Sequence, residues 1–356
     1  MNGRERLQNL FSGQPTDRLS WTTLVDHYTL NSLPASLAEM DSYAFYRYLR
    51  CDIVQLGWIY GCNRIMPGVK VTTTTDDSGT VTIQSRCDSG VLTGKISRQV
   101  HPIEYPIKTI EDVLLYTKRW EAASYVAVDE QSQYDEIEAA VGDDGITTAF
   151  IPPSVIPHFL EEAMGIEGFY YLMQDYPDEV EALIRTIDEK DRQRFEICAD
   201  GPSNVLILCE NTSTRYIGPD IYAKYNMPSQ RTFVESVHKR GKTAILHMCG
   251  HVRDILPIIK ETNTDGIHAL TPPPLGDTPW EMALDVLGDD LIIMGALTPD
   301  IFLTCPLDEV GPSLDNLISP RLRKSRFVLC PFSDGIPTPL ERFLAVRDWA
   351  EGITFG

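Results

Sequence analysis

The stretch TAILHMC, residues 243–249, is a short apolar run that ends in an imidazole and a thiol two residues apart. Similar runs rich in Val, Ile and Leu, typical of buried parallel strands, occur at 21–26, 52–58, 145–151, 204–210, 265–270, 291–297 and 326–331. Amphipathic segments separate them, such as 177–197, which starts with a proline and has apolar residues at 180, 183, 184 and 187. Eight strand–helix units predict an α/β fold, a (β/α)8 TIM barrel. An open doubly wound sheet is the alternative, weakened because no Gly-rich turn follows the first run.

Residues 67–100 break this rhythm. Thr and Val alternate there around Asp77, Ser78 and Gly79, which is typical of antiparallel hairpins. We therefore predict an antiparallel β-hairpin insertion after strand 2, within a single barrel domain that spans residues 1–356.

Composition limits the partners and the location. The 356 residues carry a formal charge of −20, which argues against nucleic acid and anionic membranes, and against a highly anionic substrate unless a local basic patch exists. No apolar stretch reaches the roughly 20 residues of a membrane span, and the first residues, MNGRERLQNLF, are charged, so we expect a cytoplasmic protein. The eight cysteines are widely spaced, which predicts ligands or nucleophiles and no disulfide framework.

The ends of the predicted strands carry the candidate site, because active sites of such barrels lie at the carboxyl ends of the strands. His247 and Cys249 point to the same side of their strand, whereas Met248 points away, and Gly250 lets the backbone turn. Imidazole and thiolate together form half of a tetrahedral zinc site. A buried cysteine beside a core histidine is the alternative interpretation.

Other strand ends add side chains that bind metals or transfer protons. These are Asp26 and His27 after the first strand, Glu210 after the fourth, and Cys330 and Asp334 at the eighth. Their convergence on one rim favours a metal site, although a proton-transfer site without metal would use the same residues. We expect His251 in a solvated loop or hydrogen-bonded behind a ligand, and His268 in the core.

Five segments in this order resemble the uroporphyrinogen decarboxylase superfamily: GQPTDRLSW (13–21), HPIEYPIKTIEDV (101–113), AILHMCG (244–250), MGALTP (294–299) and DGIPTPLERFLAV (334–346). The sequence is more narrowly similar to the zinc-dependent methyltransferases of corrinoid-dependent one-carbon metabolism, which are the methylcobamide:coenzyme M methyltransferases and their O-demethylase relatives. The most specific element is the His-x-Cys of residues 247–249.

The resemblance implies a barrel enzyme that transfers a methyl group between a corrinoid and a small-molecule donor or acceptor such as a thiol. It implies Zn²⁺ held by His247, Cys249 and a third residue before the final helix, and a corrinoid protein as partner; a homodimer is left open. The family's usual cysteine before the C-terminal Gly is replaced by Asp334, so the third ligand is Cys330, Asp334 or Glu210, with Cys330 preferred for its soft sulfur. Glu210 and Asp334 are the catalytic candidates.

Two alternatives remain from the sequence. A decarboxylase would carry an Arg-bearing motif after the first strand, but residues 25–36, VDHYTLNSLPAS, contain no arginine. The decarboxylases that this sequence resembles also carry a His directly before the Gly of the C-terminal motif, whereas this sequence has Asp334 at that position. A non-catalytic barrel that only binds a corrinoid protein or a metabolite is the third interpretation.

Overall fold

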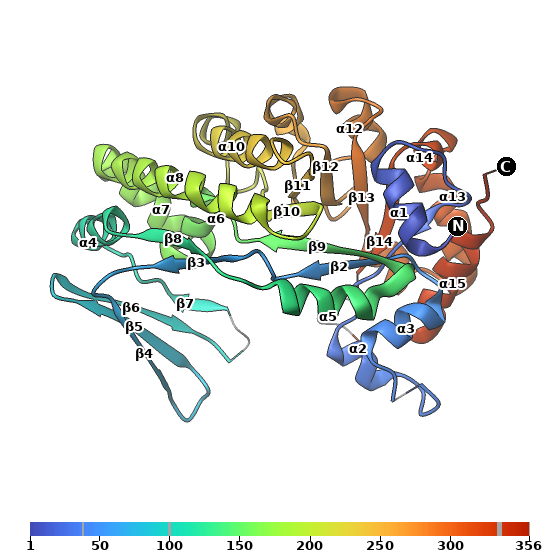
Figure 1. Cartoon of the computed structure of the whole chain (residues 1–356), viewed down its shortest axis with the longest axis horizontal. Coiled ribbons are helices and arrows are strands. Elements are labelled where there is room, and N and C mark those ends of the chain that lie inside the picture. Colours follow the sequence, from blue (N-terminus) through green and yellow to red (C-terminus); the bar gives the residue numbers. More distant parts are fainter. Residues whose placement is uncertain (38, 99–100, 333–336, 356) are drawn as a thin grey trace.

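Eight parallel strands form one curled sheet in the order β1-β14-β13-β12-β11-β10-β9-β2 (Figure 1). The computed structural model describes residues 1–37, 39–98, 101–332 and 337–355. The two end strands are neighbours, because the Asp52 amide before β2 donates to the Trp21 carbonyl of β1 at 2.8 Å. The strands are β1 (Ser20–Trp21), β2 (Ile53–Gly57), β9 (Gly145–Ile151), β10 (Val205–Cys209), β11 (Thr243–His247), β12 (Gly266–Leu270), β13 (Ile292–Leu297) and β14 (Phe327–Pro331). The predicted (β/α)8 fold is confirmed, with all eight predicted strands present, although the first covers only Ser20–Trp21 and not 21–26.

Alternation along each strand divides the core into two parts. On β10, Ile207 and Cys209 belong to an apolar cluster inside the barrel, whereas Leu206 and Leu208 pack in the larger cluster beneath the helices. Ile245 of β11 and Cys330 of β14 also belong to the inner cluster. The barrel interior is therefore a packed core, and open space for a ligand is expected at the strand ends.

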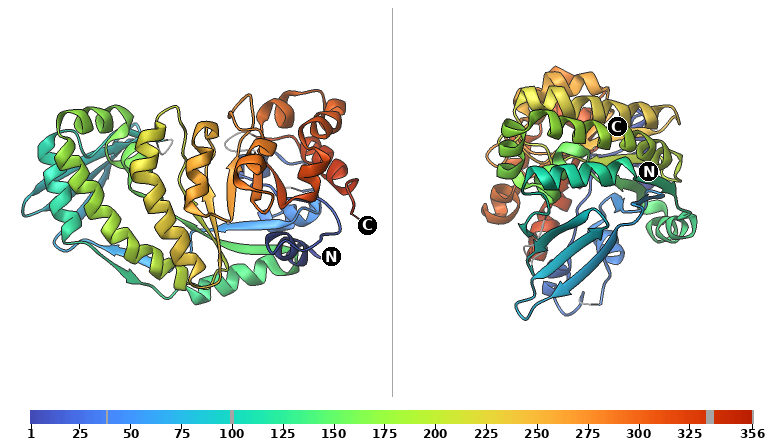
Figure 2. Two further views of the ribbon diagram at one scale, coloured as in Figure 1. Left: turned by 90° about the horizontal axis from the view of Figure 1, so that it is seen from above. Right: turned by 90° about the vertical axis from the view of Figure 1, so that its left-hand side faces the viewer.

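Helices cover the outside of the sheet, as the view from above shows (Figure 2). The longest, α8, starts with Pro177 and buries Val180, Leu183, Ile184 and Ile187, as the sequence predicts. The helices are α1 (Gly3–Phe11), α2 (His27–Ser32), α3 (Ser42–Leu49), α4 (Ile110–Glu121), α5 (Gln131–Val141), α6 (Val155–His158), α7 (Gly165–Asp175), α8 (Pro177–Asp200), α9 (Pro219–Ile221), α10 (Met227–His238), α11 (Leu256–Ile259), α12 (Trp280–Leu287), α13 (Val310–Leu317), α14 (Pro320–Lys324) and α15 (Leu340–Glu351). Within the described part of the chain, no helix is both long and apolar enough to cross a membrane.

Short 3₁₀ and π turns interrupt or extend several of these helices. The π turns are η2 (Phe159–Ala163), η3 (Tyr222–Asn226) and η6 (Asp300–Thr304). The 3₁₀ turns are η1 (Gly142–Asp144), η4 (Arg253–Ile255), η5 (Lys260–Thr262) and η7 (Leu307–Glu309). The first π turn, η2, follows β9 and α6, so it lies at the carboxyl end of the barrel strands.

The predicted insertion after β2 is confirmed and is larger than residues 67–100. Strands β4 (Lys70–Thr75), β5 (Val81–Cys87), β6 (Gly90–Ile96) and β7 (Pro102–Glu104) form an antiparallel sheet that projects from the barrel (Figures 1 and 2). A second antiparallel pair, β3 (Cys62–Ile65) with β8 (Ser124–Ala127), connects that sheet to the barrel. Because β2 ends where β3 begins to leave the barrel, the insertion stands beside the carboxyl ends of the strands.

Candidate functional site

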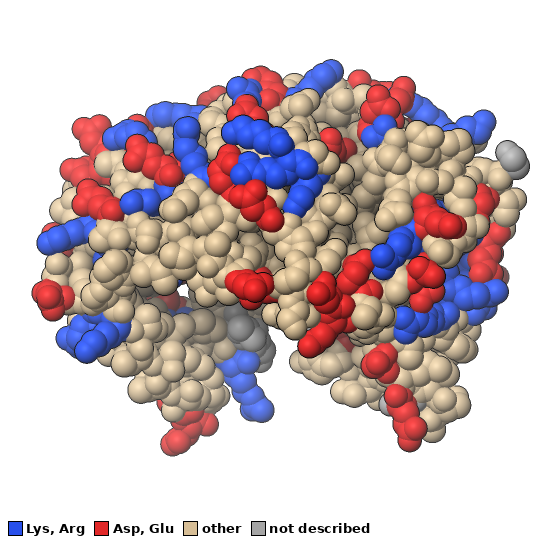
Figure 3. All heavy atoms as spheres, viewed as in Figure 1, with Lys and Arg blue, Asp and Glu red and all other residues tan. Residues whose placement is uncertain are grey.

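A notch between two lobes marks the carboxyl end of the barrel (Figure 3). One lobe is the β4–β7 sheet, which follows β2, and the other contains α2, which follows β1. Asp26 caps α2 by accepting a hydrogen bond from the Thr29 amide at 2.8 Å. Trp58, directly after β2, is 61 % exposed and contacts Phe150 edge-on at 4.9 Å between ring centroids. The rim of the barrel therefore presents aromatic surface beside the predicted ligands.

His247 is the last residue of β11 and points into the barrel mouth. Its ring lies edge-on to Phe150, and its Nδ1 is 2.7 Å from Nδ1 of His268 on β12. Burial lowers the pKa of His247 to about 4, and burial together with the neighbouring His247 holds the pKa of His268 well below its ordinary value. Both imidazoles are therefore neutral near pH 7, which is the form that binds metal ions.

The short contact between the two histidines restricts their tautomers. Only one proton can lie between two facing Nδ1 atoms, so one ring donates and the other accepts. When His247 is the donor, its Nε2 carries the lone pair that a metal requires. The core position predicted for His268 is correct, since it is 2 % exposed, but the sequence did not reveal that it contacts His247.

Cys249 lies in the loop after β11 and is exposed. Its Sγ is 3.7 Å from Oδ1 of Asn211, and Sγ of Cys209 is 3.8 Å from the same oxygen. Asn211 has a left-handed backbone, with φ 43°, and its carbonyl accepts a hydrogen bond from the Tyr216 hydroxyl. Asn211 thus connects two thiols at the rim, and the sequence analysis did not single it out.

The turn after Cys249 requires a glycine. A Cβ on Gly250 would lie 2.4 Å from Cβ of Ser213 and 2.5 Å from the Thr212 carbonyl oxygen. His251, the next residue, donates its backbone amide to the Ser213 hydroxyl at 3.2 Å, so it belongs to the same packed loop. The close approach fixes where the backbone presents Cys249.

We expect Gly250→Ala to displace this loop. The added methyl group should lower the free energy of unfolding by roughly 1–3 kcal/mol and weaken metal binding, because the Cys249 backbone must move. Thermal unfolding and titration with Zn²⁺ would measure both effects. Gly218→Ala is the matched control, because a Cβ there meets no atom within 4 Å and its φ is −65°. Equal behaviour of the two variants would contradict the expectation.

Glu210, predicted as a catalytic residue or ligand, faces away from the barrel interior. It is 0 % exposed, and its carboxylate accepts hydrogen bonds from the Ser154 amide at 2.8 Å, the Ser154 hydroxyl at 2.9 Å and Gln230 Nε2 at 2.6 Å. Burial raises its pKa. These contacts connect the ends of β9 and β10 with α10 (Met227–His238) and favour a positioning role; a catalytic role for Glu210 stays a prediction.

Cys330 is fully buried in the apolar cluster inside the barrel, and its Sγ contacts the Val328 carbonyl at 3.6 Å. Burial raises the pKa of this thiol.

Asp334 lies outside the described residues. Across residues 1–37, 39–98, 101–332 and 337–355, no three His, Cys, Asp or Glu side chains are grouped so that they could hold a metal ion. The structure thus brings His247 and Cys249 to one rim, and the third ligand stays a prediction.

Glu161 is a site residue that the sequence analysis missed. It comes from the π turn η2, lies near Asn211, and lines a cavity of about 940 Å³ between the insertion and the barrel. Burial, with the charges of Glu162 and Glu210, raises its pKa to about 7, although a hydrogen bond with Asn211 opposes the shift. Such π turns recur at functional sites, but adjacent acids in an otherwise apolar segment are a weak sequence signal.

We expect the buried proton of Glu161 to affect stability. Since its pKa is raised from 4.5 to about 7 on folding, the stabilisation is complete below pH 4.5 and is lost as the pH rises through 7. Glu161→Gln should therefore melt a few degrees higher than the parent near pH 8 and alike near pH 4, roughly 2 °C per kcal/mol. Melting curves in chelator would test this. Glu167→Gln, on the exposed part of α7, is the control. If the melting temperatures of the parent and of Glu161→Gln changed with pH in the same way, the expectation would be contradicted.

Comparison with known proteins gives the family. The model of the family named uroporphyrinogen decarboxylase (URO-D) matches residues 160–348, more than half of the chain. The chain belongs to the URO-D family. The match begins at η2 and includes β10 to β14, so it contains Glu161, His247, Cys249 and Cys330.

Two proteins that are similar to this URO-D family chain, one in sequence and one in fold, are named methyltransferases. The methylcobamide:CoM methyltransferase MtbA of Methanosarcina acetivorans is 29% identical over 68 residues, which is 19% of this chain and 20% of that protein. The match thus spans only a fifth of the curated relative. The structure of a methyltransferase from Methanosarcina mazei superposes with a TM-score of 0.61 over 99% of both chains at 15% identity, which shows the same fold.

Proposed function

We propose that this protein is a zinc-dependent methyltransferase that moves a methyl group between a corrinoid and a small-molecule donor or acceptor such as a thiol. The observation that carries the proposal is the neutral imidazole of His247 beside the exposed Cys249 at the barrel mouth. The family assignment and the similarity to a methylcobamide:CoM methyltransferase support it. A corrinoid protein is the proposed partner.

The donor set fits two positions of a zinc site, with nitrogen from His247 and sulfur from Cys249. Bound Zn²⁺ would keep a thiol acceptor in its nucleophilic thiolate form. His268 holds the tautomer of His247 through the 2.7 Å contact, and Asn211 orients the Cys249 side chain. Cys330 is the third ligand proposed from the sequence, with Asp334 as its competitor.

Glu161 is the proposed proton acceptor. Its carboxyl group lines the cavity of about 940 Å³ and, with a pKa of about 7, is half ionised near neutral pH. A carboxylate of this basicity can take the proton that a thiol loses when it becomes a nucleophile. The apolar walls of the same cavity would keep water from the reacting sulfur.

Metal analysis and a methyl-transfer assay test the proposal. We expect stoichiometric zinc in the purified protein and demethylation of methylcobalamin in the presence of some members of a thiol panel, followed by absorbance. Zinc without transfer to any thiol would direct the search to methyl ethers and methylamines as donors. A protein without zinc and without transfer would contradict the proposal and favour the decarboxylase or the binding-only barrel.

A further inference from the structure

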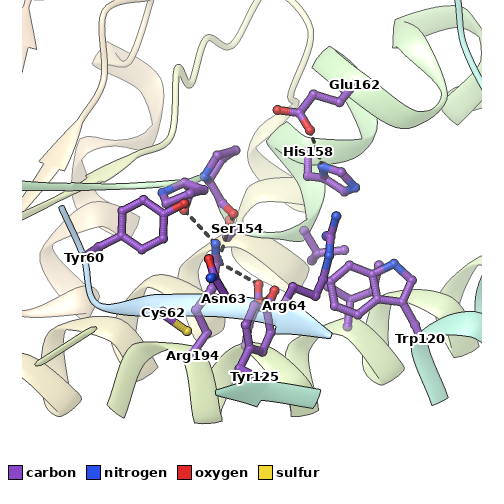
Figure 4. Close-up of a pocket in the computed structure, with 15 residues that line it drawn as sticks. Tyr60, Cys62, Asn63, Arg64, Trp120, Tyr125, Ser154, His158, Glu162 and Arg194 are labelled. Atoms are coloured by element: carbon purple, nitrogen blue, oxygen red, sulfur yellow. Dashed lines mark hydrogen bonds and ion pairs between the residues drawn. The ribbon is translucent and has the colours of Figure 1, made fainter. Parts of the chain in front are cut away.

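Two cavities lie under the insertion and meet at three shared residues. The inner cavity, of about 350 Å³, is lined by β3, β8, α4, α6 and α8 residues and is drawn in Figure 4. The outer cavity, of about 940 Å³, lies against the β4–β7 sheet and includes Glu161 and Tyr216. Arg64, His158 and Glu162 line both cavities. A ligand could therefore extend from the inner cavity to the rim where Cys249 lies.

Charges in the inner cavity do not cancel. Asp191 pairs with Arg194 at 2.8 Å, and Glu162 pairs with His158 at 3.0 Å. Tyr116 and Glu162 together raise the pKa of His158 to about 9 against the effect of burial, so this second pair is charged at neutral pH. The backbone of Arg64 belongs to the β3–β8 ladder, but within the described part of the chain its guanidinium forms no ion pair and no side-chain hydrogen bond; it only stacks on Trp120. In a chain of net charge −20, the inner cavity thus has one excess positive charge.

Arg64 is placed for a ligand. Its guanidinium lies 4.8 Å from the centroid of the Trp120 ring, and Figure 4 shows it beside that ring. The stacking leaves its N–H donors available at the junction of the two cavities. Arg194 adds a buried donor, since it is 5 % exposed and its Nε has no hydrogen-bond partner in the described residues. Buried donors without acceptors are rare unless a ligand or water completes them.

The outer cavity has the opposite character. Its walls include Val69, Ile83, Leu92, Ile96 and Ile166, which would cover an apolar ligand body. Apart from Arg64, its lysine and arginine side chains are already paired: Lys95 contacts Glu104 at 2.7 Å, and Arg119 donates to Ser85 and Gly90. The combination of an apolar chamber with one unpaired cation at its inner end matches an amphiphilic anion.

We propose that these cavities bind an organic acid with an apolar body, whose anionic group lies at Arg64 and Arg194. This inference rests on the proposed function. It identifies the acid as the small-molecule methyl donor or acceptor of that reaction. Its reacting end would lie in the outer cavity toward Glu161 and Tyr216. Charge-assisted hydrogen bonds to a guanidinium are about twice as strong as neutral ones, so the anionic group should dominate selectivity.

Calorimetric titration with benzoate and benzamide tests the site. The two probes share their shape and differ in charge, so their affinity ratio measures anion recognition. We expect benzoate to bind roughly tenfold more tightly than benzamide, and Arg64→Gln to remove this preference. Arg64→Lys, which retains the charge, should keep most of it.

Arg86→Gln is the matched control, because Arg86 is exposed on β5 of the same insertion and lines neither cavity. Equal affinity for the two probes, absence of saturable benzoate binding, or an equal loss in Arg64→Gln and Arg86→Gln would overturn the proposal. The titration needs neither zinc nor corrinoid. A negative result would therefore leave the proposed methyl transfer standing, and a failed methyl-transfer assay would leave the anion site standing.

Discussion

Cys249→Ser is expected to lose zinc and methyl transfer together. The substitution replaces a soft thiolate with a harder hydroxyl that stays protonated at neutral pH, so one of the two ligand atoms at the barrel mouth disappears. Changes to residues behind a ligand typically cost 10–100-fold in metal affinity or activity, so loss of the ligand itself should exceed about 100-fold. Metal analysis and the methylcobalamin assay on one preparation would measure both quantities.

The loss should be specific, because Cys249 is exposed and contributes no buried apolar packing. The melting temperature of metal-free Cys249→Ser should equal that of the metal-free parent. Cys87→Ser is the control variant, since Cys87 is a partly exposed cysteine on β5 that lines neither cavity. A Cys249→Ser protein that kept its zinc and its turnover would show that Cys249 is not a ligand of a catalytic metal.

The barrel could be predicted because its strands differ from its helices in hydrophobic period. Each parallel strand is buried on both faces and reads as a continuous apolar run, as in Val205–Cys209. The insertion was recognised by its Thr and Val alternation, but its full extent was not. Cys62 of β3 pairs with Ala127 of β8, which is 65 positions later in the sequence, and only the folded chain brings the two strands together.

The direction of each side chain explains which site residues could be predicted. Side chains alternate along β10, and Ile207 and Cys209 point into the barrel. Glu210, one residue later, therefore faces the helices, where its carboxylate accepts hydrogen bonds from Ser154 and Gln230. Counting from the inward residues would have shown this in the sequence. The contact between His247 and His268 depends on the register of β11 against β12, which the sequence does not contain. Glu161 reaches Asn211 through a π turn, which has no clear sequence signal.

Removal of the third zinc ligand should also abolish metal binding. We expect X-ray absorption of the zinc form to show one sulfur at about 2.3 Å with nitrogen and oxygen neighbours, and we expect Asp334→Ala to lose zinc. The sequence preferred Cys330 for its softness. In the structure, however, Cys330 is packed among Ile245, Met294 and Val328 inside the barrel and contacts a backbone carbonyl, so binding zinc would require β14 to move.

Cys330→Ala and Asp334→Ala form the decisive pair of variants. Cys330→Ala should keep its zinc and lose only stability, about 1–3 kcal/mol, because it removes a buried sulfur from an apolar cluster. Two sulfurs in the absorption spectrum, with zinc lost from Cys330→Ala, would instead assign Cys330 and restore the preference drawn from the sequence. Glu210→Gln tests the last of the three candidate ligands. We expect this variant to retain zinc, because the Glu210 carboxylate already accepts hydrogen bonds from Ser154 and Gln230. A site with one thiolate and a carboxylate would be harder than one with two thiolates, and it would favour oxygen-bearing substrates over a thiol acceptor.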